Sequence, residues 1–162
     1  MIHFQQSQAQ RNIFDAARNN DLMTIEACLS PHNIDTINSE GHTLLTLSIY
    51  NGSGNVAKYL LVHGANPNLK DHAGNTALMG ACFKGYDTMV SLLLYYGANI
   101  NDINFNGANA LFFAATFGHI GIAKLLLEKG INTAQKDQFE KTALDYAVIQ
   151  GNEEMIALLR RY

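Results

Sequence analysis

The segment DHAGNTALMGACFKGYDTMVSLLLYYGANIN, residues 71–101, contains every part of the structural unit from which the chain is built. Thr76 can cap a helix, because its hydroxyl can accept from a free amide of the first helical turn. We expect that helix to run to Gly85 and a second, leucine-rich helix to follow it. Gly97 then stands where a glycine in the left-handed conformation can end the second helix. The segment therefore predicts a helix, a tight turn, a second helix and a polar loop.

Three sets of landmarks recur along the chain every 33 residues. They are Gly41, Gly74, Gly107 and Glu140; then Gly52, Gly85, Gly118 and Gly151; then Gly64, Gly97 and Gly130. A fixed period of this length marks a stack of supersecondary units, none of which can bury its apolar face alone. The period predicts an all-α solenoid whose function lies on its surface.

The other units repeat the same parts. Thr43, Asn109 and Thr142 occupy the cap position of Thr76. Each first helix has a small facing side, with Ala81 and Cys82 and then Ala114 and Ala115, and each second helix carries the apolar mass. We expect the following residues to form the interfaces between units: Val56, Leu60 and Leu61; Met89, Val90, Leu92, Leu93 and Leu94; Ile122, Leu125, Leu126 and Leu127; Met155, Ile156, Leu158 and Leu159.

An atypical unit precedes the regular four, because Ala16 and Ala17 followed by Leu22, Ile25 and Leu29 repeat the helix pair one residue out of register. Gln5, Gln6, Gln8, Gln10 and Arg11 suit a polar N-terminal cap, and Glu153, Glu154, Arg160 and Arg161 give the last helix a solvated face. We expect one domain over 1–162, capped at both ends, with repeats at 5–37, 38–70, 71–103, 104–136 and 137–162.

The units resemble the ankyrin repeat. The T-P-L-H start of that family reads here as Thr43-Leu44-Leu45-Thr46 and Thr76-Ala77-Leu78-Met79, as Asn109-Ala110-Leu111-Phe112 and as Thr142-Ala143-Leu144-Asp145. Its G-H turn is present at Gly118-His119, and its G-A-D-x-N segment appears as Gly64-Ala65-Asn66-Pro67-Asn68 and Gly97-Ala98-Asn99-Ile100-Asn101. The proline and histidine of T-P-L-H are missing from every unit. The resemblance implies a solenoid of helix pairs with hairpin-like loop tips, whose partners meet those tips and the concave face of the first helices.

Charge and composition limit the partners and the location. The net charge is −3, and the 11 Lys and Arg are scattered, so nucleic acid is not an expected partner. Residues 1–12 lack the basic and apolar regions of a signal peptide, and no stretch approaches the roughly 18 apolar residues of a membrane span. We expect a cytoplasmic monomer without membrane contact, although export by another route would leave no mark. Cys28 and Cys82 are expected to be buried and reduced.

Two patterns suggest chemistry, and we interpret both as structural. The stretch Gly52-Ser53-Gly54-Asn55-Val56-Ala57 matches a dinucleotide-binding fingerprint, but it joins two predicted helices where that motif needs a strand before the helix. The six histidines contain no metal-binding pair at helical spacing. His119 resembles the structural turn histidine of the family, whereas a ligand shared by His42, His63 and His72 stays open beside their interpretation as exposed polar residues. We expect no enzyme activity, no metal and no cofactor.

Aromatic residues recur at the variable surface positions of successive units. Tyr50, Phe83 and Phe117 come just before the turn glycines, and Phe105 and Phe139 lie at loop tips. Exposed aromatic residues across neighbouring units favour a protein interface, whereas Phe112 and Phe113, inside a first helix, are expected to be core. The predicted partner-binding residues are Tyr50, His72, Phe83, Lys84, Phe105, Phe117 and Phe139.

The sequence thus predicts a non-enzymatic protein-binding module. Two alternatives follow from the resemblance to short ankyrin proteins: an accessory factor for a haem enzyme such as catalase, and a secreted effector or toxin-neutralising protein. Repeat scaffolds vary their surface residues freely, so the partner is not named by the fold.

Overall fold

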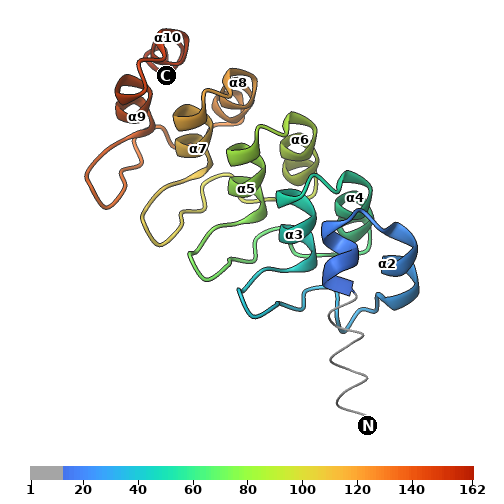
Figure 1. Ribbon diagram of the computed structural model, residues 1–162. Coiled ribbons are helices and arrows are strands. Elements are labelled where there is room, and N and C mark those ends of the chain that lie inside the picture. Colours follow the sequence, from blue (N-terminus) through green and yellow to red (C-terminus); the bar gives the residue numbers. More distant parts are fainter. Residues whose placement is uncertain (1–12) are drawn as a thin grey trace.

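The computed structural model describes residues 13–162, which form a stack of helix pairs in two parallel rows (Figure 1). Long loops project from one side of the stack, beside the row of first helices. In this part of the chain, strand-type pairing is confined to one isolated bridge between Ile37 and Thr43. The expected all-α solenoid is confirmed for these residues. The polar residues Gln5, Gln6, Gln8, Gln10 and Arg11, assigned to an N-terminal cap, lie outside the described residues.

The two rows alternate along the chain. Residues 13–18 are helical and are followed by α2 (Leu22–Cys28), which together make the atypical first pair. The first-helix row continues with α3 (Leu44–Tyr50), α5 (Ala77–Lys84), α7 (Ala110–Phe117) and α9 (Ala143–Ile149). The second-helix row continues with α4 (Gly54–Val62), α6 (Asp87–Tyr95), α8 (Ile120–Glu128) and α10 (Glu153–Leu159). From α3 to α10, each helix contacts the other helix of its pair and an adjacent helix of its row, and α2 contacts α4.

Local capping explains where the first helices begin. The Thr43 hydroxyl accepts from the Thr46 amide at 3.0 Å, and Thr76 accepts from Met79 at 3.5 Å. The Asn109 side chain accepts from Leu111 at 3.1 Å, and Thr142 forms a reciprocal capping box with Asp145. The predicted caps are confirmed. At the other ends of the pairs, Gly64, Gly97 and Gly130 have positive φ angles, as predicted.

Small residues let the first helices pack closely. Ala81, Cys82, Ala114 and Ala115 are all completely buried, and Leu93 at the centre of the second row is buried as well. The leucines of the second helices differ in burial. Leu92, Leu94 and Leu125 are only half-buried. The buried ones are Leu60, Leu61, Leu93, Leu126, Leu127, Leu158 and Leu159. The buried apolar face of the second helices therefore includes fewer residues than the sequence analysis predicted.

The prediction that Cys28 is buried was wrong. Cys28 is exposed, whereas Cys82 is buried, and burial raises the pKa of the Cys82 thiol. The physical reason is the position of α2 in the stack, where α4 is its neighbour in the row and Ile25 is the one buried residue of its seven. At the other end, Glu153, Glu154, Arg160 and Arg161 are exposed, as expected of a solvated face.

Candidate functional site

Each projecting loop begins with an Asn or Asp that fixes the backbone of the tip. The Asp71 Oδ1 atom accepts from the amides of Ala73 at 2.9 Å and Asn75 at 2.8 Å. Asn38, Asn104 and Asp137 make the same pair of bonds in their own loops, to the amides two and four residues further on. Because the side-chain oxygen binds two backbone amides of the same turn, the backbone of the loop tip is held in one conformation.

Hydrogen bonds also tie each loop to the next. The Phe105 amide donates to the Ala73 carbonyl at 3.1 Å, and the Gln138 amide donates to the Asn106 carbonyl at 2.8 Å. The Asn104 side chain donates to Asn75 Oδ1 at 2.9 Å. These contacts make the tips of the last three loops one continuous surface.

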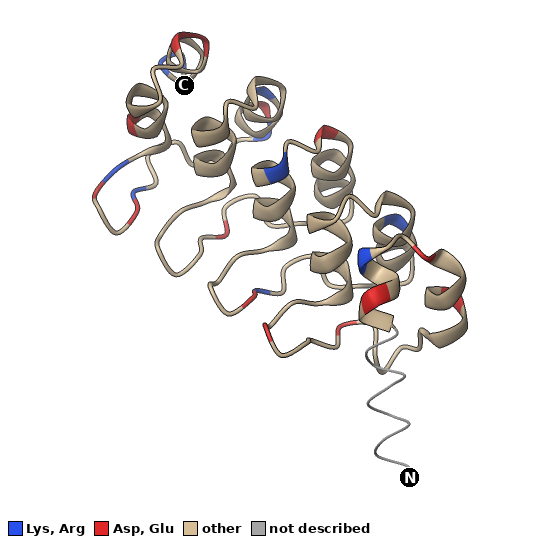
Figure 2. Ribbon diagram, in the orientation of Figure 1, with Lys and Arg blue, Asp and Glu red and all other residues tan. Residues whose placement is uncertain are grey.

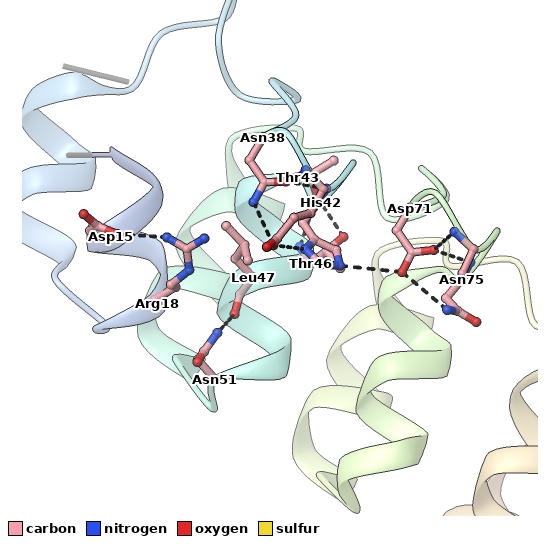
Figure 3. Close-up of polar contacts among 12 residues, drawn as sticks. Asp15, Arg18, Asn38, His42, Thr43, Thr46, Leu47, Asn51, Asp71 and Asn75 are labelled. Carbon is pink, nitrogen blue, oxygen red and sulfur yellow. Dashed lines mark hydrogen bonds and ion pairs between the residues drawn. The ribbon is translucent and has the colours of Figure 1, made fainter. Parts of the chain in front are cut away.

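Between the second and third units, the side chains of His42 and Asp71 stand at the repeat positions of Asn75 and Asn104. The His42 Nε2 atom lies 3.7 Å from Asp71 Oδ2, and its Nδ1 atom lies 3.3 Å from Glu40 Oε2 (Figure 3). The Tyr50 ring lies 5.9 Å from the His42 ring. Burial, with a smaller contribution from the Asp71 charge, raises the pKa of Tyr50.

Phe105 and His72 are placed by glycines of the preceding loop. Gly74 has a φ of +80°, and a Cβ atom built on it would lie 2.7 Å from the Phe105 amide nitrogen and 2.8 Å from its ring. His72 packs on Gly41 in the same way. A side chain at Gly74 would therefore displace Phe105, which extends into solvent with 73% of its surface exposed.

Phe83 and Phe117 form a pair across two units. Their ring centroids are 4.7 Å apart, with the ring planes at 81°, which is the edge-to-face geometry that aromatic rings prefer. The Lys84 Nζ atom lies 5.7 Å from the Phe83 ring. Behind the pair, the His119 Nε2 atom is 3.2 Å from the Phe83 carbonyl, so the predicted structural role of His119 is confirmed.

A groove of about 320 Å³ lies beside this pair, between helices α7 and α9 and the last three loops. We call it the α7–α9 groove. Its apolar lining includes Phe113, Phe117, Phe139 and Tyr146, and its polar lining includes Asn106 and Gln138.

The α7–α9 groove is poor in charge. No Lys, Arg, Asp or Glu occurs between Asp102 and Lys124, and Figure 2 shows α7 without a charged residue. The carboxylate of Asp137 lines the groove, but Tyr146 donates its hydroxyl to it at 2.5 Å. Burial raises the pKa of Asp137, and the hydrogen bonds from Tyr146, Lys141 and Phe139 outweigh that effect and lower it overall. Asp137 is therefore ionised and already paired at neutral pH.

The structure brings most of the predicted binding residues to the surface. Phe83, Phe105, Phe117 and Phe139 are 37%, 73%, 50% and 67% exposed, and His72 and Lys84 are exposed too. Tyr50 differs from this expectation, because its ring packs over Gly80 and is half-buried. We call Phe83, Phe105, Phe117 and Phe139 the aromatic face.

Two residues of the groove were missed by the sequence interpretation. Phe113 was expected to be core like Phe112, but Phe113 is half-buried and lines the groove, whereas Phe112 is buried. Tyr146 was not considered. The signal was their spacing, because Phe113 and Tyr146 stand 33 residues apart at one position of the repeat and so project in the same direction.

The remaining candidate features have structural partners. His63 stacks on Tyr59 at 3.9 Å, and the stretch from Gly52 to Ala57 joins α3 to α4 without a strand before it. Among residues 13–162, no group of three His, Cys, Asp or Glu is placed to hold a metal ion. Over the same residues, no helix has the length and apolar character needed to cross a bilayer.

Comparison with known families finds one match. A family model for ankyrin repeats, in three copies, matches residues 13–104 and again residues 99–162. No curated protein matches the chain.

Proposed function

Because this chain belongs to the ankyrin-repeat family, whose members generally mediate protein–protein interaction, we propose that it is a non-enzymatic module that binds one partner protein through the aromatic face. The observation that carries this proposal is the exposure of four phenylalanines on successive units that are hydrogen-bonded to one another. Exposed aromatic rings on a rigid support supply large contact area at small entropic cost, and they dominate the energy of many interfaces.

Tyr50, His72 and Lys84 are assigned to the rim of the same surface. His72 is exposed at the loop tip of the third unit, Lys84 is exposed beside Phe83, and Tyr50 contacts the same unit at Gly80. Polar and half-buried rim residues contribute less energy to an interface than its centre, so we expect smaller effects from their replacement.

We also expect the helix pairs to act as one domain over 1–162, as a monomer in the cytoplasm. Sedimentation at working concentration and cell fractionation test these two expectations. Three of the described histidines, His42, His63 and His119, contact protein groups of their own and so do not favour the haem-accessory alternative. The effector alternative would use the same aromatic face.

A pull-down from native lysate tests the proposed function. We compare the wild-type chain with the Phe83→Ala, Phe117→Ala double variant and with Tyr95→Ala, which removes an aromatic ring that is 83% exposed on α6. The wild type and Tyr95→Ala should retain the same partner, and the double variant should lose it while its helical circular dichroism is kept. Equal retention by all three chains would refute the aromatic face as the binding surface.

A further inference from the structure

The chemistry of the α7–α9 groove suggests which part of a partner it receives, and this inference rests on the proposed function. Thirteen residues line the groove, and among them Asp137 alone carries a charge at neutral pH. Its Oδ1 atom accepts from the Phe139 and Lys141 amides, and its Oδ2 atom accepts from the Tyr146 hydroxyl. A ligand in the groove therefore meets one buried negative charge, both of whose oxygens already accept hydrogen bonds from neutral donors, and no positive charge.

The free polar groups in the groove are neutral, and two of them are side-chain amides. Asn106 and Gln138 are exposed at the tips of the last two loops, and within residues 13–162 neither side-chain amide bonds to another residue. An amide side chain offers both a donor and an acceptor, which is what the N–H and C=O groups of a peptide backbone need. The backbones that carry these two amides are joined by the bond from Gln138 to Asn106, so their spacing is fixed.

The apolar lining and the size of the groove suit a short stretch of chain. Phe117 and Phe139 present 50% and 67% of their surface, and Phe113 and Tyr146 lie half-buried in the same lining. A volume of about 320 Å³ is at the lower end of ligand pockets, which span roughly 300 to 1,000 Å³. It can take a few side chains of a partner, but not a folded surface.

We propose that the α7–α9 groove binds an extended, uncharged segment of the partner protein. Apolar side chains of the segment pack on Phe117 and Phe139, and its peptide groups bond to Asn106 and Gln138. An acidic residue is excluded, because it would lose its hydration near the negative charge of Asp137. A basic residue is excluded, because Asp137 is buried and both of its carboxylate oxygens are already hydrogen-bonded, so the lost hydration is not replaced by a direct ion pair. The groove thus sets the chemical identity of the bound segment, whereas the wider aromatic face supplies contact area.

Selection from a phage-displayed library of random 12-residue peptides on the full-length chain tests this proposal. The enriched peptides should contain Asp, Glu, Lys and Arg at less than half their frequency in the input. Asn106→Asp and Gln138→Lys, which add charges of opposite sign, should each weaken the binding of a selected peptide at least tenfold. Asn19→Asp, the same change at an exposed residue outside the groove, should leave it unchanged. Circular dichroism checks that all three variants are folded.

Other outcomes would overturn the proposal. Enriched peptides as charged as the input, no enrichment at all, or unchanged binding to Asn106→Asp would each refute it. Residues 1–10 also lack Lys, Arg, Asp and Glu, so a synthetic peptide of residues 1–12 is measured as well. Binding of that peptide as tightly as the selected ones, with the same loss in Asn106→Asp, would assign the groove to the chain itself. If the pull-down still depends on Phe83 and Phe117, the proposed function survives such a failure.

Discussion

Gly85→Ala should destabilise the protein far more than Gly97→Ala, although both glycines have left-handed backbone and stand at helix ends. Their φ angles are +75° and +86°. An alanine in this conformation costs about 1 kcal/mol at either position. At Gly97 no atom lies within 4 Å of the added Cβ, so the backbone strain is the whole cost of the substitution. At Gly85 the Cβ would lie 2.5 Å from His119 Cε1, about 1 Å closer than an ordinary contact.

The His119 ring must therefore move, and with it the contact between its Nε2 atom and the Phe83 carbonyl. Overpacking of this kind costs about 1 to 3 kcal/mol, and a lost hydrogen bond costs about 1 kcal/mol. We expect Gly85→Ala to lower the free energy of unfolding by about 3 to 5 kcal/mol in total. Urea denaturation followed by circular dichroism measures both variants.

A double-mutant cycle separates the clash from the backbone strain. His119→Ala removes the obstructing ring, so Gly85→Ala in that background should cost only the strain of about 1 kcal/mol. Equal destabilisation by Gly85→Ala and Gly97→Ala, or a full Gly85→Ala penalty in the absence of His119, would refute the reasoning.

Three further predictions concern packing, pH and thiol reactivity. Leu93→Ala, which empties a completely buried position, should cost about 2 to 5 kcal/mol in urea denaturation, and a midpoint that hardly moves would contradict its central place in the stack. Tyr146→Phe removes the hydroxyl that lowers the pKa of Asp137, so it should cost about 1.5 kcal/mol at pH 7. Because a lowered carboxyl pKa stabilises the folded chain only while the group is ionised, the cost should begin to decrease as the pH falls below the ordinary carboxyl pKa of about 4, and it should vanish below the lowered pKa of Asp137. A cost that is constant from pH 7 to about pH 2 would contradict this. Cys28 should react with a thiol reagent in the folded protein, whereas Cys82 should react only after unfolding; titration of one and then two thiols checks this, and a protected Cys28 would contradict its exposure.

The fold could be predicted because its signals are local and repeated. Thr76 caps α5 through its own hydroxyl, and Gly85 ends the same helix with its own backbone, so both boundaries can be located without knowledge of tertiary contacts. The 33-residue period then places each helix pair beside the next, since units of one length and shape stack in one way.

Surface exposure could be predicted less well, because it depends on what the neighbouring unit presents. Tyr50 and Phe83 stand at the same repeat position, 33 residues apart. Gly80 of the third unit leaves room for the Tyr50 ring, whereas the fourth unit has Phe113 in the place of Gly80, and Phe83 pairs with Phe117 instead. Cys28 follows the same rule, because α2 lies at the end of the row.

The residues that line the α7–α9 groove could not be predicted from the sequence, because they come from several units. Its lining comes from loops and helices of successive units, and a hydrogen bond between two loop tips holds Asn106 beside Gln138. The lack of charge from 103 to 123 was visible in the sequence, but its meaning depends on Asp137 being paired with Tyr146.

Site-specific photo-crosslinking in cells tests most directly whether the aromatic face binds a partner protein. A photoreactive phenylalanine analogue replaces Phe117, Phe139 or, as the matched control, Tyr95, which is 83% exposed on the second-helix row. We predict that one partner is crosslinked from positions 117 and 139 and not from position 95. Crosslinking of the partner from position 95, with none from positions 117 and 139, would contradict the assignment of binding to the aromatic face.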